Sequence, residues 1–261
     1  LEGSKANRNR IEPQFDEKTC YDYFKNTLKS KHKNKHFDMP QWMKTLTDPE
    51  VPFDMEGPSF SEIKKIINKM RSSASPCPFD QISSLIIKKC PIIQTIVWKI
   101  IDKIWSDGDF PKIWKSSFTV LAYKKGSPSD VSNFRPITLE PVMSKIFTAF
   151  VRNRIYSYLV ANNYINTELQ KGFWSNISGT VEHTEMMTHL INHARSKQRS
   201  LTISLIDLRN AFGEVHHDLL KSVLNFHHIT LHAVSKICNI YTDYTVSIAT
   251  GNFITNPIVV V

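Results

Sequence analysis

The spacing of hydrophobic residues predicts helices and strands from about residue 58 onward, after a polar and uneven beginning. Ser59 and Glu62 fit a capping box at the start of a first helix. The apolar residues of this helix recur three and four positions apart, at Ile63, Ile66, Ile67 and Met70. Pro76 and Pro78 then end the helix and force a loop.

Two longer helices are predicted farther along the chain. One begins at Pro91 and stops at Gly108, because proline favours the first turn of a helix and glycine its end. We expect its apolar stripe to be buried, namely Ile92, Ile93, Ile96, Val97, Ile100, Ile101 and Ile104. The other helix covers residues 141–159 and places Arg152 and Arg154 on its surface, away from its buried side. That buried side comprises Val142, Ile146, Phe147, Phe150, Val151, Ile155 and Tyr158.

Strands and helices alternate unevenly in the rest of the chain. Four segments are rich in β-branched and aromatic residues and are predicted as strands: 117–125, 201–208, 245–250 and 258–261. Helices are predicted around Met186 to Ile191, over 215–226 and over 233–241. This uneven order favours an α+β fold over a doubly wound sheet.

Composition adds a basic character. The 261 residues carry 33 Lys and Arg against 24 Asp and Glu, a formal charge of +9, which favours a polyanionic partner such as nucleic acid or an acidic membrane surface. The run of basic residues at 29–36 is more typical of a solvated linker than of a phosphate contact. A basic α+β interaction module that binds no nucleic acid also fits the composition.

Two further features of the sequence, its cysteines and the length of its apolar runs, bear on the compartment and on membrane attachment. The four cysteines show no CxxC spacing and no signal peptide precedes them, so we expect a reducing, intracellular compartment with neither a disulfide framework nor a zinc site. No uninterrupted apolar run approaches about 18 residues, so no membrane span is expected.

Asp207 is the first candidate for chemistry. It interrupts the apolar segment 201–208, and a carboxylate there is costly to bury unless it faces a cleft, a cation or a donor. Spacing alone supports equally an aspartate that caps the turn after the strand.

A second candidate is a phosphate clamp formed by Lys124, Lys125 and Arg135 across a short polar loop. An ordinary basic turn explains the same spacing, and spacing alone favours it.

The histidines do not form a recognisable catalytic or metal site. His189 and His193 have the spacing of a helical metal pair, but Leu190 stands where a metalloprotease needs its glutamate. We therefore interpret them as surface or interface histidines.

Four segments, taken in order, resemble the reverse transcriptase of non-LTR (LINE-like) retrotransposons. "RSSASPCPFDQIS" is similar to the family's Pro-Gly-x-Asp-Gly loop, with Cys77 or Pro78 and Gln81 in place of the glycines. "FPKIWKSSFTVLAYKKGSPSDVSNFRPITLEPVMSKIF" resembles the fingers segment, and "LQKGFWSNISGTVEHT" the loop before the palm. "LIDLRNAFGEVHHDLL" resembles the palm motif with the first catalytic aspartate. The resemblance runs from about residue 59 to the end.

The resemblance implies roles for individual residues. Asp207 corresponds to the catalytic aspartate that binds both Mg²⁺ ions, and the Leu208 carbonyl to a further metal ligand. Phe212 matches the aromatic that favours dNTP over rNTP by its shape. Arg135, with Lys124 or Lys125, matches fingers residues that hold the triphosphate. Gly213 stands where many relatives have Asp.

The same resemblance implies the architecture and the partners. It predicts polymerase fingers and an incomplete palm of a right-hand reverse transcriptase at 111–261, a helical N-terminal extension at 58–110, and a polar, basic segment at 1–57. RNA template, DNA primer and dNTP are the implied partners.

A departure from the family pattern limits the expected activity. The Tyr/Phe-x-Asp-Asp hairpin that supplies the second carboxylates does not occur in the 261 residues, and both ends of the chain look cut. We therefore expect this chain alone to be an inactive fragment with an exposed sheet edge. The alternative is a remnant that binds nucleic acid without catalysis, in which Asp207 is merely structural.

Overall fold

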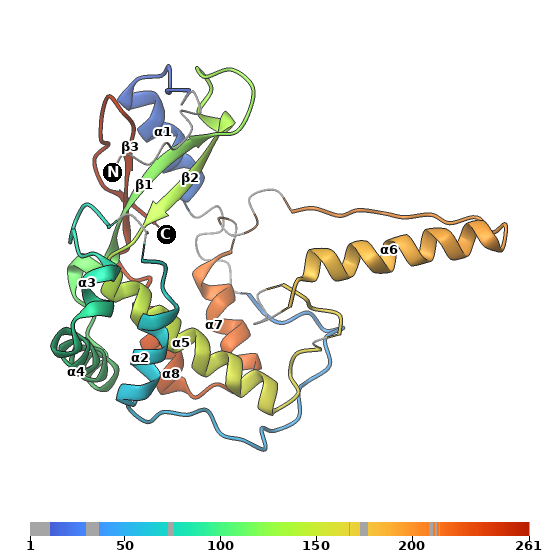
Figure 1. The fold of residues 1–261 in the computed structure, drawn as a ribbon, viewed down its shortest axis with the longest axis horizontal. Helices are drawn as coiled ribbons and strands as arrows, with labels where there is room; N and C mark the ends of the chain where they lie inside the picture. The colour runs from blue at the N-terminus through green and yellow to red at the C-terminus, as the bar shows by residue number, and fades with distance from the viewer. Residues whose placement is uncertain are drawn as a thin grey trace.

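The computed structural model describes residues 11–29, 37–72, 76–166, 168–172, 177–208, 211, 213 and 215–260. Its helices are α1 (Glu17–Leu28), α2 (Phe60–Lys69), α3 (Ser84–Lys89), α4 (Pro91–Asp107), α5 (Val142–Ala161), α6 (Gly179–Ser196), α7 (His217–Phe226) and α8 (Leu231–Asn239) (Figure 1). Short 3₁₀ helices cover Lys112–Lys115 and Val131–Asn133. The strands are β1 (Ser116–Tyr123), β2 (Phe134–Leu139), β3 (Thr245–Ala249) and β4 (Ile258–Val259). Within these ranges, no helix has the length and apolar character that crossing a bilayer requires.

The four strands form one mixed sheet in the order β2-β1-β3-β4. β1 and β2 pair antiparallel with Tyr123 opposite Phe134, and β1 and β3 pair parallel with Ser116 opposite Thr245. β4 pairs antiparallel with β3. The predicted strands at 117–125 and 245–250 are therefore confirmed. The one predicted at 258–261 is confirmed for Ile258–Val259, and Val261 lies outside the described residues. The mixture of helices with one small mixed sheet agrees with the predicted α+β class.

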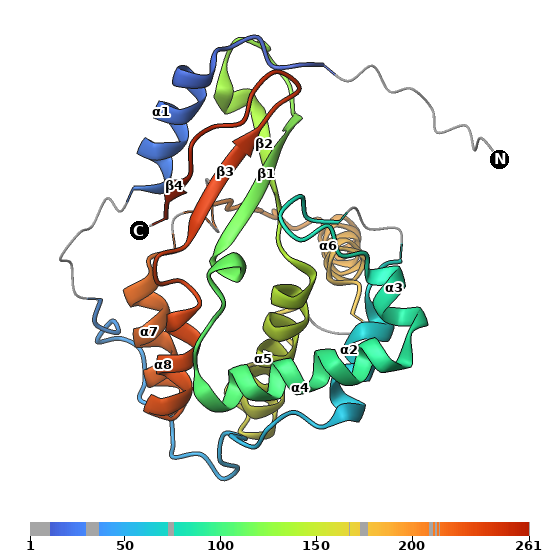
Figure 2. The same cartoon turned by 90° about the vertical axis from the view of Figure 1, so that its left-hand side faces the viewer.

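The two faces of the sheet differ in their cover. α1 packs on one face (Figure 2), where Cys20 and Phe24 meet the inward side chains of the strands. Those side chains are Leu121, Phe134, Val246, Ile248 and Ile258, with Val131 beside them. On the opposite face Ile137 is 48% exposed, although it is apolar. We call this second side the open face of the β1–β2 hairpin.

The main core lies among α2, α4, α5 and α8, below the sheet in Figure 2. Trp105 packs edge to face against Phe150, with ring centroids 5.1 Å apart, and Phe110 packs in the same way against Phe147 at 4.9 Å. The core joins α2 and α4, which belong to the predicted N-terminal extension, to α5 and α8, which follow later in the chain. Helix α5 therefore packs against elements that precede it and elements that follow it in the sequence.

The prediction for α4 is correct for its ends and wrong for half of its stripe. Gly108 has φ 80 at the end of the helix, a conformation that glycine adopts without steric cost. Val97, Ile101 and Ile104 are buried as expected. However, the isoleucines of the other face are exposed by 73%, 50% and 40%, at Ile92, Ile96 and Ile100. α4 is apolar on two sides, and only one of them meets α2 and α5.

The predicted position of Arg154 is also wrong, because Arg154 is buried and only 8% exposed. Its guanidinium donates to both carboxylate oxygens of Glu62, each at 3.1 Å, and to the backbone oxygen of Asp54. Glu62 therefore does not complete a capping box, although Ser59 does accept from its backbone N–H as predicted. A buried charge is tolerated here because it is compensated by two acids, Glu62 and Asp54, and by backbone carbonyls.

The segment 201–208 was predicted as a strand, and this prediction is wrong. It forms no ladder, and Leu205 and Ile206 are 90% and 91% exposed. A strand exists through its backbone hydrogen bonds to a neighbour, and no described strand pairs with this segment. It follows α6, which projects away from the other elements in Figure 1 and has no buried residue among its described side chains.

Candidate nucleic-acid interface

The open face of the hairpin carries two of the predicted triphosphate ligands. Arg135 lies opposite Ala122 in the β1–β2 pair, and Lys124 follows Ala122 by two residues. Because side chains alternate along a strand, Lys124 and Arg135 project from the same face. The Lys124 N–H still donates to the Asn133 oxygen at 2.8 Å, so the pairing reaches past the end of β1. Lys125 is the next residue, and all three cations are exposed.

The loop after α2 is fastened to α5 by Asp80 and to the sheet by Phe79. One carboxylate oxygen of Asp80 accepts from the Val142 N–H at 3.0 Å, and the other accepts from the Ile82 N–H at 3.2 Å. The first bond satisfies an N–H at the start of α5, where the helix dipole also favours an anion. Phe79 contacts Phe118 of the open face edge to face, with centroids 6.0 Å apart. The loop and the hairpin therefore form one continuous surface.

Gln81 adopts an unusual backbone conformation in this loop. Its φ is 52, in the left-handed region that favours glycine, and its N–H donates to the Cys77 oxygen at 2.8 Å. The family resemblance places a glycine at this position, and the geometry explains why a glycine suits it.

We expect Gln81→Gly to raise the free energy of unfolding by about 0.5 to 1 kcal/mol, because relief of left-handed strain exceeds the entropy that glycine adds to the unfolded chain. Urea denaturation measures the change. The matched control is Gln14→Gly: Gln14 is also exposed but is not among the residues with positive φ, so its substitution should not stabilise the protein. A loss of stability in Gln81→Gly would contradict the strain argument.

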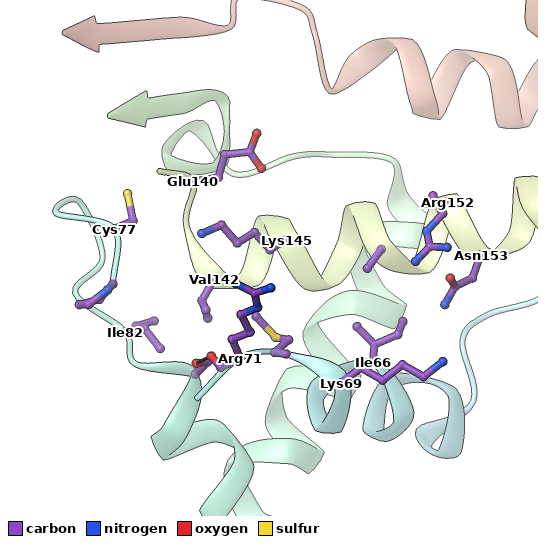
Figure 3. Close-up of a pocket in the computed structure, with 14 residues that line it drawn as sticks. Ile66, Lys69, Arg71, Cys77, Ile82, Glu140, Val142, Lys145, Arg152 and Asn153 are labelled. Carbon is purple, nitrogen blue, oxygen red and sulfur yellow. Dashed lines mark hydrogen bonds between the residues drawn. The ribbon is translucent and has the colours of Figure 1, made fainter. Parts of the chain in front are cut away.

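A pocket of about 340 Å³ lies between α2, the loop after it and the first half of α5 (Figure 3). Its apolar lining includes Ile66, Val142 and Ala149. Four cationic side chains border it: Lys69, Arg71, Lys145 and Arg152. A second hollow of about 320 Å³ shares Ile66, Lys69 and Asn153 with the first, so the two continue as one groove along α2 and α5.

The charge around the pocket is predominantly positive. Among the described residues, none of the four cations has an ion-pair partner. The one carboxylate in the lining, Glu140, accepts from the Tyr244 hydroxyl at 3.4 Å and points away from Lys145 in Figure 3. Burial raises the pKa of the Cys77 thiol, which therefore stays neutral near pH 7 and donates to the Leu139 oxygen. The arrangement suits an anion with an apolar part.

The predicted catalytic residues are only partly described. Asp207 is exposed and makes no hydrogen bond or ion pair with another described residue, and Leu208 is 72% exposed. Phe212 lies outside the described residues, and Gly213 is exposed. In the described part of the chain, no ladder connects the Asp207 segment with the hairpin that carries Lys124 and Arg135.

Metal ligands do not gather in the part of the chain that the structure describes. There, no group of three or more His, Cys, Asp or Glu side chains could hold an ion. Asp207 alone supplies one carboxylate, whereas a pair of divalent ions needs bridging charge from more than one. The described residues therefore do not fit a complete two-metal site.

Comparison with known proteins finds similarity to RNA-directed DNA polymerases of retrotransposons. It is 28% identical over 188 residues to the probable RNA-directed DNA polymerase from transposon BS of Drosophila melanogaster. It is 27% identical over 175 residues to the RNA-directed DNA polymerase from mobile element jockey of the same fly. A Pol polyprotein from the type-1 retrotransposable element R2 of Nasonia vitripennis is 26% identical over 185 residues. No family profile matches the chain.

These alignments cover 70%, 64% and 71% of this chain but only 20%, 19% and 17% of the relatives. The chain thus spans about a fifth of the length of the curated relatives that it matches. The predicted resemblance to non-LTR retrotransposon RNA-directed DNA polymerases is confirmed by these similarities.

Sequence reasoning missed the residues that build the pocket. Asp80 lies inside a recognised loop, but its bond to the start of α5 joins positions 62 residues apart. Arg71, Lys145 and Arg152 are scattered basic residues in the chain and come together only through the packing of α2 on α5. A helical wheel would have placed Lys145, Ala149 and Arg152 on one side of α5, which is the one signal that was available.

Proposed function

We propose that this chain is the fingers and part of the palm of an RNA-directed DNA polymerase from a non-LTR retrotransposon. The observation that carries the proposal is its similarity to polymerases of three such elements over about two thirds of its length. The proposed division is a polar segment at 1–57, a helical N-terminal extension at 58–110, and fingers with a partial right-hand palm at 111–261. RNA template, DNA primer and dNTP are the proposed partners, in a reducing intracellular compartment.

The geometry of the hairpin supports a role in holding the triphosphate. Lys124 and Arg135 share the open face, and a guanidinium can bind two phosphate oxygens at once while an ammonium acts as a point charge. Lys125 extends the same positive surface. In this proposal Phe212 selects dNTP over rNTP by shape.

In this proposal the Asp207 carboxylate and the Leu208 carbonyl are the groups of this chain that bind Mg²⁺. When bound, two such ions would activate the primer 3′-hydroxyl and stabilise the leaving pyrophosphate. Asp207 is free to turn toward such a site, since its segment makes no ladder among the described residues. Because it supplies one carboxylate only, we propose that the 261-residue chain by itself does not polymerise DNA.

Primer extension on an RNA template with Mg²⁺ and dNTP tests this proposal. The 261-residue chain should give no extension, and a longer protein that also contains the family's x-Asp-Asp carboxylates should give it. In that longer protein we expect Asp207→Asn to lower the rate by about 100-fold or more, because the loss of a metal ligand removes several kcal/mol of transition-state stabilisation. RNA binding should be retained.

Asp109→Asn is the matched control, because Asp109 is exposed and has no assigned role. It should leave the rate unchanged. If Asp207→Asn supports synthesis at the parent rate, the catalytic assignment is wrong.

A second function, nucleic-acid binding without catalysis, is favoured by one observation. Four cationic side chains border the groove between α2 and α5, whereas the described residues contain no group of three or more potential metal ligands. In that case the longer protein would bind RNA with a steep salt dependence and would not extend a primer, with or without Asp207.

A further inference from the structure

Helix α6 carries two exposed histidines one turn apart. His189 and His193 both lie within Gly179–Ser196, and their spacing of four residues places them on the same side of the helix. Cβ atoms at this spacing are about 5 to 6 Å apart. The helix therefore converts a spacing in the sequence into two imidazole rings that can approach one ion together.

The pair lies on the solvent side of α6. The partly covered side chains in this half of the helix are Met187, Ile191 and Ala194. Each residue turns the helix by about 100°, so both histidines lie about 160° around the axis from Ile191. The helix also projects away from the other elements in Figure 1 and has no buried residue among its described side chains. Both rings are therefore open to an ion from solvent.

The ring nitrogens of both histidines are available as ligands. Within the described residues, neither imidazole takes part in a hydrogen bond or an ion pair. The Ser196 hydroxyl and the Lys197 N–H both donate to the backbone oxygen of His193 and leave its ring free. Glu185, one turn before His189, is also exposed and adds a negative charge on the same side, which favours a cation.

Two imidazoles one turn apart on a helix are the pair that the H-E-x-x-H motif presents to zinc. Leu190 in place of the glutamate removes the general base of a metalloprotease, but not metal binding, because the glutamate of that motif does not hold the ion. Imidazole suits zinc and neighbouring transition metals, whereas Mg²⁺ prefers oxygen. Since the described residues form no group of three or more ligands, water would complete the coordination.

We propose that His189 and His193 form a two-histidine site for Zn²⁺ on the exposed side of α6, with open coordination positions toward solvent. The site uses neither Asp207 nor Mg²⁺, so it stands or falls independently of the proposed polymerase function. An ion that bridges two residues one turn apart also stabilises the helical turn between them, because it binds the helical form in preference to the unfolded one.

Isothermal titration of the untagged 261-residue chain with Zn²⁺ tests the site in the parent, in His189→Ala, in His193→Ala and in the double variant. Either single substitution should weaken zinc binding at this site at least about tenfold, because one imidazole alone forms no chelate. The double variant should bind within about twofold of the single variants, since the two rings act as one site. Additive losses would show two independent ions and would overturn the proposal.

His183→Ala is the matched control. His183 is an exposed histidine of the same helix, and the residues three and four positions away from it are Gly, Thr and Met, so it has no second ligand at chelating distance. Its substitution should leave zinc affinity unchanged. A loss equal to that of His189→Ala would contradict the assignment of the site.

Amide hydrogen exchange then locates the ion on the chain. Zn²⁺ should slow exchange along α6 in the parent and in His183→Ala, because the bridged turn opens less often. It should not do so in His189→Ala or His193→Ala. Zinc binding without protection of α6, or protection that persists in His189→Ala, would overturn the site.

Discussion

Arg154→Ala is expected to lower the free energy of unfolding by about 3 to 5 kcal/mol, because it leaves a partly buried acid without its partner. The Arg154 guanidinium donates hydrogen bonds to both carboxylate oxygens of Glu62 on α2 and to the backbone oxygen of Asp54. It also lies over the Phe150 ring, with its central carbon 4.9 Å from the ring centroid. The substitution therefore disconnects α5 from α2 and from the segment before it. Urea denaturation with linear extrapolation measures the loss.

Two controls separate the buried pair from a general effect of charge. Arg152→Ala removes an exposed arginine two residues earlier and should change stability by less than about 0.5 kcal/mol. Arg154→Met combined with Glu62→Gln removes the charges of Arg154 and Glu62, and should be more stable than Arg154→Ala because the less exposed of the two acids that pair with Arg154 is then neutral. The other acid, Asp54, is 54% exposed and stays hydrated. Equal stability of Arg154→Ala and the parent chain would show that this pair does not join the helices.

Ile101→Ala is expected to lower the free energy of unfolding by about 2 to 5 kcal/mol, the range for removal of buried methyl and methylene groups from a packed core. Ile101 is fully buried in the main core between α2, α4 and α5. Ile100 is its matched control, since it is the same residue type one position earlier and is 40% exposed. Ile100→Ala should cost less than about 1 kcal/mol, because alanine also favours the helix.

The same pair tests which side of α4 faces the core. Thermal and urea unfolding of the two variants should separate them clearly, with a lower midpoint for Ile101→Ala alone. If the two substitutions cost the same, then α4 is not oriented as described here.

Local signals were sufficient for most helix ends and for three of the four predicted strands. Ser59 caps α2, Pro91 starts α4 and Gly108 ends it, because each of these effects depends on a few neighbouring residues. The strand prediction at 201–208 failed for the opposite reason. Its apolar and β-branched residues suit a strand, but a strand needs a partner, and none of the described strands pairs with it.

The sequence by itself determined most of the helices and three of the strands, the basic character, the resemblance to retrotransposon polymerases and the positions that carry its motifs, since these depend on residue type and order. Tertiary structure alone decided which sides of those elements are covered. It buried Arg154 against Glu62, exposed Ile92 and Ile96, and brought Arg71 to Lys145 across two helices. The physical reason is that burial and electrostatic contact between helices depend on distances across the fold, which the local pattern of either helix does not contain.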